Sequence, residues 1–293
     1  MSASELSLLY PAFFIGAVGL LGLLVGSFLN VLVYRLPIMM EREWQSQARE
    51  VLSLEADTQA EVFNLAQPCS RCPGCGHQVR PWENIPVLSW IMLRGRCSSC
   101  KQSISLRYPL VECFSALLSS LVAAKFGYGP TCLAMLVLAW GSIALVMIDF
   151  DHQLLPDSIV QPGIWIGLGI GYMGFLTSLS SSFIGVILGY LSFALPAWLY
   201  SKVTGRDGMG DGDFKLMALF GAWLGWQMLP LIFLLSSLAA AIAGVLLGRM
   251  RDESYPFGPF IIVAGFVALF FGHDLYAWYA HANGFRLDKS FFG

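Results

Sequence analysis

The sequence predicts an all-α integral membrane protein of about eight transmembrane helices, with a zinc-ribbon-like cytoplasmic loop domain. Its 293 residues are 56% hydrophobic and 12% charged, about half the charged fraction of an average soluble domain. Its apolar residues form stretches of about 20, which is the length that crosses a bilayer. Two Cys-x-x-Cys pairs interrupt the single long polar segment. The composition excludes an ordinary soluble enzyme and a disordered chain, and the net charge of −2 excludes a nucleic-acid binder that depends on bulk charge.

The first span is expected at residues 11–33, within a first region of residues 1–34. No basic residue precedes it and no small-residue cleavage site follows it, so we expect a permanent span rather than a removed signal peptide. A polar loop region, residues 35–108, comes next and contains nine of the 17 basic residues. Within this loop, the mixed charges of residues 41–61 predict a solvated helix.

A membrane core of seven spans is expected over residues 109–280, followed by a tail at 281–293. The apolar stretches of this core are 109–126, 131–148, 158–176, 183–200, 214–248 and 257–280. The stretch 214–248 would be about 52 Å long as one helix, against a hydrocarbon core of about 30 Å. Pro230 therefore predicts a break that divides it into two short spans.

The basic residues predict the orientation in the membrane. With the large loop in the cytoplasm and the spans alternating, 14 of the 17 basic residues lie on the cytoplasmic side. Both termini then lie on the opposite side. Several glycines recur four residues apart, among them Gly22 and Gly26, Gly185 and Gly189, and Gly221 and Gly225. This spacing predicts close helix packing within the membrane.

The two cysteine pairs predict a zinc site. Cys72 and Cys75 form one knuckle, and Cys97 and Cys100 form the other. Each knuckle turn presents two thiolates from one side, and four thiolates satisfy tetrahedral Zn²⁺ without leaving a coordination position open, which indicates a structural site. Two unrelated reduced or redox pairs are the alternative. Cys69 and His77 are adjacent candidates as substitute ligands.

Two aspartates are expected at the same depth on the cytoplasmic side. Asp149 ends the third predicted span and Asp213 begins the sixth. Two nearby carboxylates resist double ionisation and share a proton, so one can activate water while the other protonates a leaving nitrogen. The pair therefore indicates aspartyl proteolysis. From the residues alone, interface or capping roles and a proton or ion path remain open.

Other acidic residues have weaker predicted roles. Asp211 also ends a G-x-G-D pattern and competes with Asp213, which directly precedes the span. Asp157 follows a proline before a span and is expected to cap that helix. Glu112 lies inside a predicted span, so it either pairs with a basic residue such as Arg107 or contributes to a site.

Almost the whole chain resembles the type IV prepilin peptidases, which are bifunctional leader peptidases and N-methyltransferases of bacterial inner membranes. The resemblance rests on the following motifs: Gly26–Val31 with Tyr34–Pro37, Ser70–His77, Asn84–Trp90, Leu93–Cys97, Arg107–Glu112, Asp149–His152 leading to Leu155–Asp157, and Gly210–Asp213 with Phe214 and Lys215. The Phe-Lys continuation favours Asp213 over Asp211 as the aspartate of the G-x-G-D motif.

The resemblance implies that the chain cleaves the basic leader from type IV prepilins and type II secretion pseudopilins at the cytoplasmic membrane face. It also implies that S-adenosylmethionine then methylates the new N-terminal amine. No nucleotide-type glycine fingerprint marks a donor site, so the methyl-donor residues stay unassigned. The resemblance implies Asp149 and Asp213 as the catalytic residues. A carboxylate-relay transporter and a non-enzymatic zinc-ribbon membrane scaffold are the alternatives.

Overall fold

The computed structural model describes residues 10–54, 62–206, 208–246 and 256–282. The longer helices are α2 (Pro11–Val51), α4 (Arg107–Phe126), α5 (Pro130–His152), α6 (Asp157–Tyr172), α7 (Leu179–Thr204), α8 (Asp211–Leu224), α9 (Leu229–Leu246) and α10 (Gly258–Ala282). The short ones are α3 (Leu88–Met92), η1 (Pro81–Asn84) and η2 (Trp226–Met228). Over these ranges the chain forms no β-strand, only two isolated bridges in the loop, which confirms the all-α class.

The predicted number of spans was wrong. Six helices within the described ranges are long and apolar enough to cross a membrane: α2, α4, α5, α7, the η2–α9 segment and α10. Helices α6 and α8 have 16 and 14 residues, and so measure only about 24 and 21 Å. The long apolar stretch breaks at Gly225 rather than at Pro230, because Gly225 has a φ of 79° and ends α8. Pro230 is the second residue of α9, a position where helices tolerate proline.

The chain forms two compact units, residues 1–144 and 145–293. In the first unit, α2 is one helix of 41 residues, about 62 Å long and twice the hydrocarbon thickness. The predicted span and the first part of the predicted loop helix are therefore continuous as far as Val51. Of residues 41–61, those from 55 to 61 lie outside the described part.

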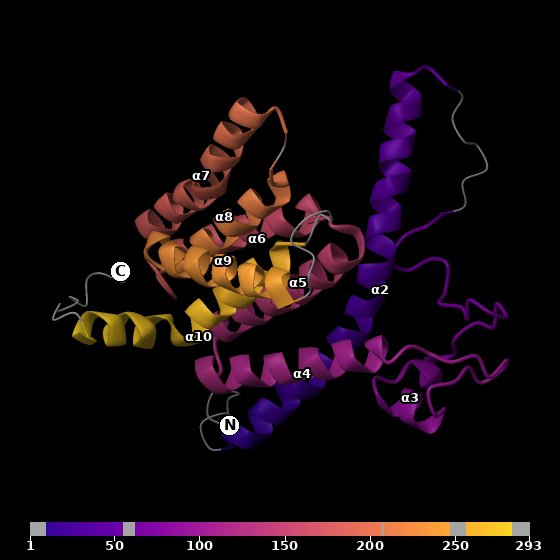
Figure 1. Ribbon diagram of the computed structural model, residues 1–293. Coiled ribbons are helices and arrows are strands. Elements are labelled where there is room, and N and C mark those ends of the chain that lie inside the picture. Colours follow the sequence, from indigo (N-terminus) through magenta and orange to yellow (C-terminus); the bar gives the residue numbers. More distant parts are fainter. Residues whose placement is uncertain (1–9, 55–61, 207, 247–255, 283–293) are drawn as a thin grey trace. The chain divides into compact units, whose positions relative to one another are not determined.

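Helices α2 and α4 pack side by side (Figure 1), and glycines make the close approach possible. A Cβ on Gly26 would lie 2.7 Å from the Glu112 Cα, and one on Gly22 would lie 2.8 Å from the Ser115 carbonyl oxygen. The four-residue glycine spacing in α2 thus has its predicted packing role.

In the second unit, α8 occupies the interior. Nine of its residues are buried, Phe214 and all those from Leu216 to Trp223. Helices α6 and α7 flank it. Gly185 of α7 meets Gly221 of α8 backbone to backbone, and the Trp223 indole donates a 2.9 Å hydrogen bond to the Gly163 carbonyl of α6. Burial of α8 explains how a short helix persists among longer ones: its neighbours, rather than lipid, surround it.

Candidate functional site

The four predicted cysteines come together in the first unit. Their sulfur atoms all lie within 4.8 Å of one another. The Cys72 and Cys100 sulfurs are 3.7 Å apart, and the Cys75 and Cys97 sulfurs are 4.0 Å apart. A tetrahedral zinc ion with Zn–S bonds of about 2.3 Å requires sulfurs about 3.8 Å apart. The donor set and its spacing therefore fit Zn²⁺.

The two knuckles have matching backbone geometry. The Cys72 N–H donates to the His77 carbonyl and the Cys97 N–H to the Gln102 carbonyl, both at 2.8 Å. An isolated antiparallel bridge closes each knuckle, Arg71 with Gln78 and Arg96 with Ser103. Each turn also has a left-handed residue after its second cysteine, Gly76 in the first and Lys101 in the second. This repetition presents both thiolate pairs in the same way.

The two predicted substitute ligands lie outside the cluster. The His77 Nε2 is 3.2 Å from a Glu83 carboxylate oxygen and 3.3 Å from the Ser98 hydroxyl. The Arg80 backbone N–H also donates to Glu83, and together with Ser98 and His77 it lowers the pKa of Glu83 from 4.5 to about 2. Cys69 is exposed and is not part of the cluster. His77 therefore ties the two knuckles together through Ser98 and Glu83.

In the second unit, Asp149 is buried, with 5% of its surface exposed, three residues before α5 ends. The Gly258 backbone at the start of α10 hydrogen-bonds to its carboxylate. The Asp149 Oδ2 atom has no hydrogen-bond partner within the described residues. A buried carboxylate oxygen without a partner is costly, so this atom is a candidate for contact with a reactant.

Asp213 lies in the first turn of α8, where the helix dipole favours a negative charge. It is half-buried and lies within electrostatic range of Asp149. The competing residue Asp211 is exposed. The structure thus brings together the two aspartates that the sequence singled out, 64 residues apart, and leaves Asp211 at the surface.

Two residues lie next to this pair: Leu155, which the sequence placed only in a motif without a role, and Gly258, which it did not single out. Leu155, in the loop after α5, contacts both Gly212 and Gly258. A Cβ on Gly212 would lie 3.0 Å from the Leu155 Cβ, and a Cβ on Gly258 would lie 2.6 Å from the Asp149 Oδ2. Three chain segments therefore converge at the carboxylates. The available signal was a glycine between two prolines, Pro256-Phe257-Gly258-Pro259, just before the last span.

The capping role expected for Asp157 is wrong. Pro156 occupies the N-cap position of α6, and its cap has no side-chain hydrogen bond. Asp157 instead accepts two hydrogen bonds from the Lys215 ammonium group, at 2.9 and 2.8 Å. This ion pair links the first residue of α6 to the fifth residue of α8, the helix that carries Asp213.

Two sequence families match adjacent parts of the chain. Residues 20–126 match the bacterial peptidase A24 N-terminal domain, and residues 136–245 match the type IV leader peptidase family. A relative from Pseudomonas putida, named prepilin leader peptidase/N-methyltransferase, is 54% identical over 91% of this chain and 94% of its own length. The chain belongs to the type IV leader peptidase family.

Further members of this leader peptidase family support the assignment. Relatives with the same name from Pseudomonas aeruginosa and Neisseria gonorrhoeae are 51% and 44% identical, over 94% and 90% of this chain and 97% and 92% of their own lengths. No solved structure gives a significant match. The family resemblance inferred from the motifs is confirmed.

Glu112 of this leader peptidase connects α4 to the loop. Its Oε2 accepts a 2.8 Å hydrogen bond from the Val87 backbone N–H, and the Ser27 hydroxyl of α2 also bonds to it. Val87 has a φ of 59°, a strained value for a β-branched residue. Glu112 thus holds a strained loop turn against two helices.

Proposed function

We propose that this chain cleaves the basic leader peptide from type IV prepilins and type II secretion pseudopilins by aspartyl proteolysis. It then transfers a methyl group from S-adenosylmethionine to the new N-terminal amine. The names of the relatives give both activities, and this chain aligns with more than nine-tenths of each relative's length. This supports the pairing of the two reactions. The observation that carries the proteolytic step is the convergence of Asp149 and Asp213.

In the proposed reaction, Asp149 and Asp213 share one proton. The ionised carboxylate takes a proton from a water molecule while the oxygen of that water bonds to the scissile carbonyl carbon. The protonated partner first stabilises the carbonyl oxygen. The C–N bond then breaks as a proton passes to the leaving nitrogen, giving a free carboxyl and a free amine. The unpartnered Asp149 Oδ2 supports a direct role for that carboxyl in this chemistry.

We propose that the reaction takes place at the cytoplasmic face of a bacterial inner membrane, with the bilayer surrounding the apolar helices. The concentration of basic residues in the polar loop supports a cytoplasmic loop. The substrate's apolar helix would then remain in the bilayer while its leader lies in the cytoplasm.

The four-cysteine cluster would hold a structural zinc ion. Four thiolates complete its coordination, so the metal would supply folding energy to a loop with few apolar residues, rather than a reactive water. The methyl donor would supply the transferred methyl group to the amine released by cleavage.

Cleavage of a purified prepilin by the chain in detergent tests this function. The product mass should correspond to loss of the leader and, with S-adenosylmethionine present, to one added methyl group. Asp149→Asn and Asp213→Asn should each reduce cleavage at least about 100-fold, whereas the exposed neighbours Asp151→Asn and Asp211→Asn should retain it. Unimpaired cleavage by either of the first two variants would refute the assigned pair. No cleavage by folded wild-type protein would favour a transporter or scaffold.

A further inference from the structure

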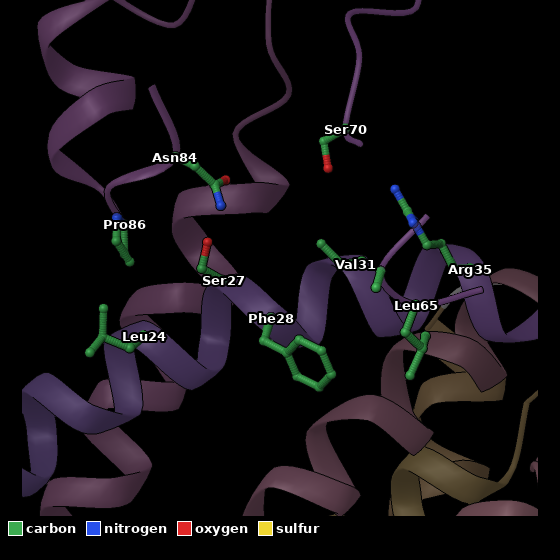
Figure 2. Close-up of a pocket in the computed structure, with 10 residues that line it drawn as sticks. Leu24, Ser27, Phe28, Val31, Arg35, Leu65, Ser70, Asn84 and Pro86 are labelled. Carbon is green, nitrogen blue, oxygen red and sulfur yellow. The ribbon is translucent and has the colours of Figure 1, made fainter. Parts of the chain in front are cut away.

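A cavity of about 290 Å³ opens in the first unit between one face of α2 and the polar loop (Figure 2). Five lining residues recur along α2 at helical spacing: Leu24, Ser27, Phe28, Val31 and Arg35. From Ser27 to Arg35 the helix rises about 12 Å. The loop supplies the opposite wall with Leu65, Ala66, Ser70, Asn84 and Pro86. The cavity therefore has a mixed lining, in which apolar side chains lie between polar groups at separated points.

Arg35 is the unusual member of this lining, because it is 6% exposed and carries a full charge. Its two terminal nitrogens donate to the Asn64 and Pro68 carbonyls at 2.8 and 2.6 Å. These acceptors are neutral and leave other guanidinium N–H groups for a ligand. No carboxylate of the described chain forms an ion pair with Arg35. A buried guanidinium that no described carboxylate neutralises favours an anionic group in the cavity, and a carboxylate can accept two hydrogen bonds from its N–H groups.

The far end of the cavity is lined by neutral polar groups and lies close to an acidic side chain. Ser27 lines it and hydrogen-bonds to the buried Glu112. Asn84, also in the lining, offers an amide that can both donate and accept. Phe28, half of whose surface is exposed, lies between the two ends and offers an apolar ring face. The cavity thus presents a carboxylate-binding end, an apolar middle and an end close to an acidic side chain.

We propose that this cavity is the methyl-donor site, in which Arg35 binds the carboxylate of the methionine part of S-adenosylmethionine. This inference rests on the proposed methyl transfer. The donor combines a carboxylate, a sulfonium cation and an aromatic base. The carboxylate suits Arg35, the cation suits the end of the cavity near Glu112, and the base suits the apolar side chains of the lining. The basic leader of the substrate is a poorer match, because Arg35 would repel it.

Calorimetric binding of S-adenosylmethionine and of its demethylated product to the full-length chain in detergent tests the site. Arg35→Gln should weaken binding of both at least tenfold. Val31→Phe, which fills the cavity without removing the Arg35 hydrogen bonds, should do the same. Arg49→Gln, the same change at an exposed position of α2, should bind within twofold of wild type. Zinc content measured on each variant reports whether the loop remains folded.

Normal donor binding by Val31→Phe would overturn the proposal, even if Arg35→Gln lost both donor and zinc. A higher KM for prepilin with unchanged donor binding would also overturn it and assign the cavity to the substrate. The proposed function is judged separately by wild-type activity. If the wild type cleaves and methylates while the cavity variants bind donor normally, only the site is wrong. If the wild type does neither, the function itself fails.

Discussion

Gly258 lies against the Asp149 carboxylate, where a Cβ would come within 2.6 Å of Oδ2. Gly258→Ala should therefore displace the carboxylate from Asp213 and reduce the kcat of prepilin cleavage at least tenfold, since small misplacements of reacting groups are costly. A quantitative cleavage assay in detergent measures this. Gly169→Ala, where a Cβ meets open space, is the matched control and should cleave normally. Equal activity of the two variants would show that Gly258 does not position Asp149.

The residues after the second cysteine of each knuckle allow a reciprocal test. Gly76 and Lys101 both have left-handed backbones, with φ values of 70° and 63°. A side chain there costs about 1–2 kcal/mol, and glycine relieves it. Lys101→Gly should therefore slow transfer of zinc from the full-length chain to a chelator, and Gly76→Ala should speed it. Changes of the opposite sign would contradict the equivalence of the two knuckles.

The sequence allowed prediction of those residues that a short motif or a hydropathy boundary marks. Cysteine spacing identified the thiolate cluster, and the positions of Asp149 and Asp213 at apolar boundaries predicted their shared depth. Sequence reasoning missed Gly258, because the glycine between two prolines does not reveal that it contacts Asp149, more than 100 residues away. Asp157 was misread because a proline before it suggested capping, whereas its partner Lys215 lies on another helix.

At the scale of helices, contact between α2 and α4 depends on Gly26, whose added Cβ would meet the Glu112 backbone. Gly26→Leu should lower the stability of the first unit by about 1–3 kcal/mol, because the helices must separate. Thermal unfolding in detergent, with Gly16→Leu as the control on an open face of α2, measures this. An unchanged Tm for Gly26→Leu would mean that the contact contributes nothing to stability.

Helix existence could be predicted from hydropathy, but helix length could not. The apolar run 214–248 gave no sign that Gly225 would adopt a φ of 79° and end α8 after 14 residues. Likewise, the polar composition after Val33 suggested that the first helix ends there, whereas α2 continues through Pro37 to Val51. Hydropathy reports the surrounding solvent, while backbone geometry decides where each helix ends.

At the scale of the whole molecule, the polar loop and the turn at residues 127–129 lie at opposite ends of α4, a 20-residue helix that can span the bilayer. If the loop is cytoplasmic, alkaline phosphatase inserted after Gly129 should be active in a bacterial host. Insertion after Ser53 should give an inactive fusion. The reverse pattern would invert the proposed orientation and place the cysteine cluster outside the cytoplasm.

We propose that Asp149 and Asp213 act as one unit. The most direct test of this proposal is the kcat/KM of prepilin cleavage for wild type, Asp149→Asn, Asp213→Asn and the double variant, with zinc content as the folding control. Groups that share one proton are not additive, so each single variant should lose about 100-fold to 10,000-fold, and the double variant should lose no more than the singles. A single variant that retains substantial activity, or losses that multiply in the double variant, would contradict the shared-proton mechanism.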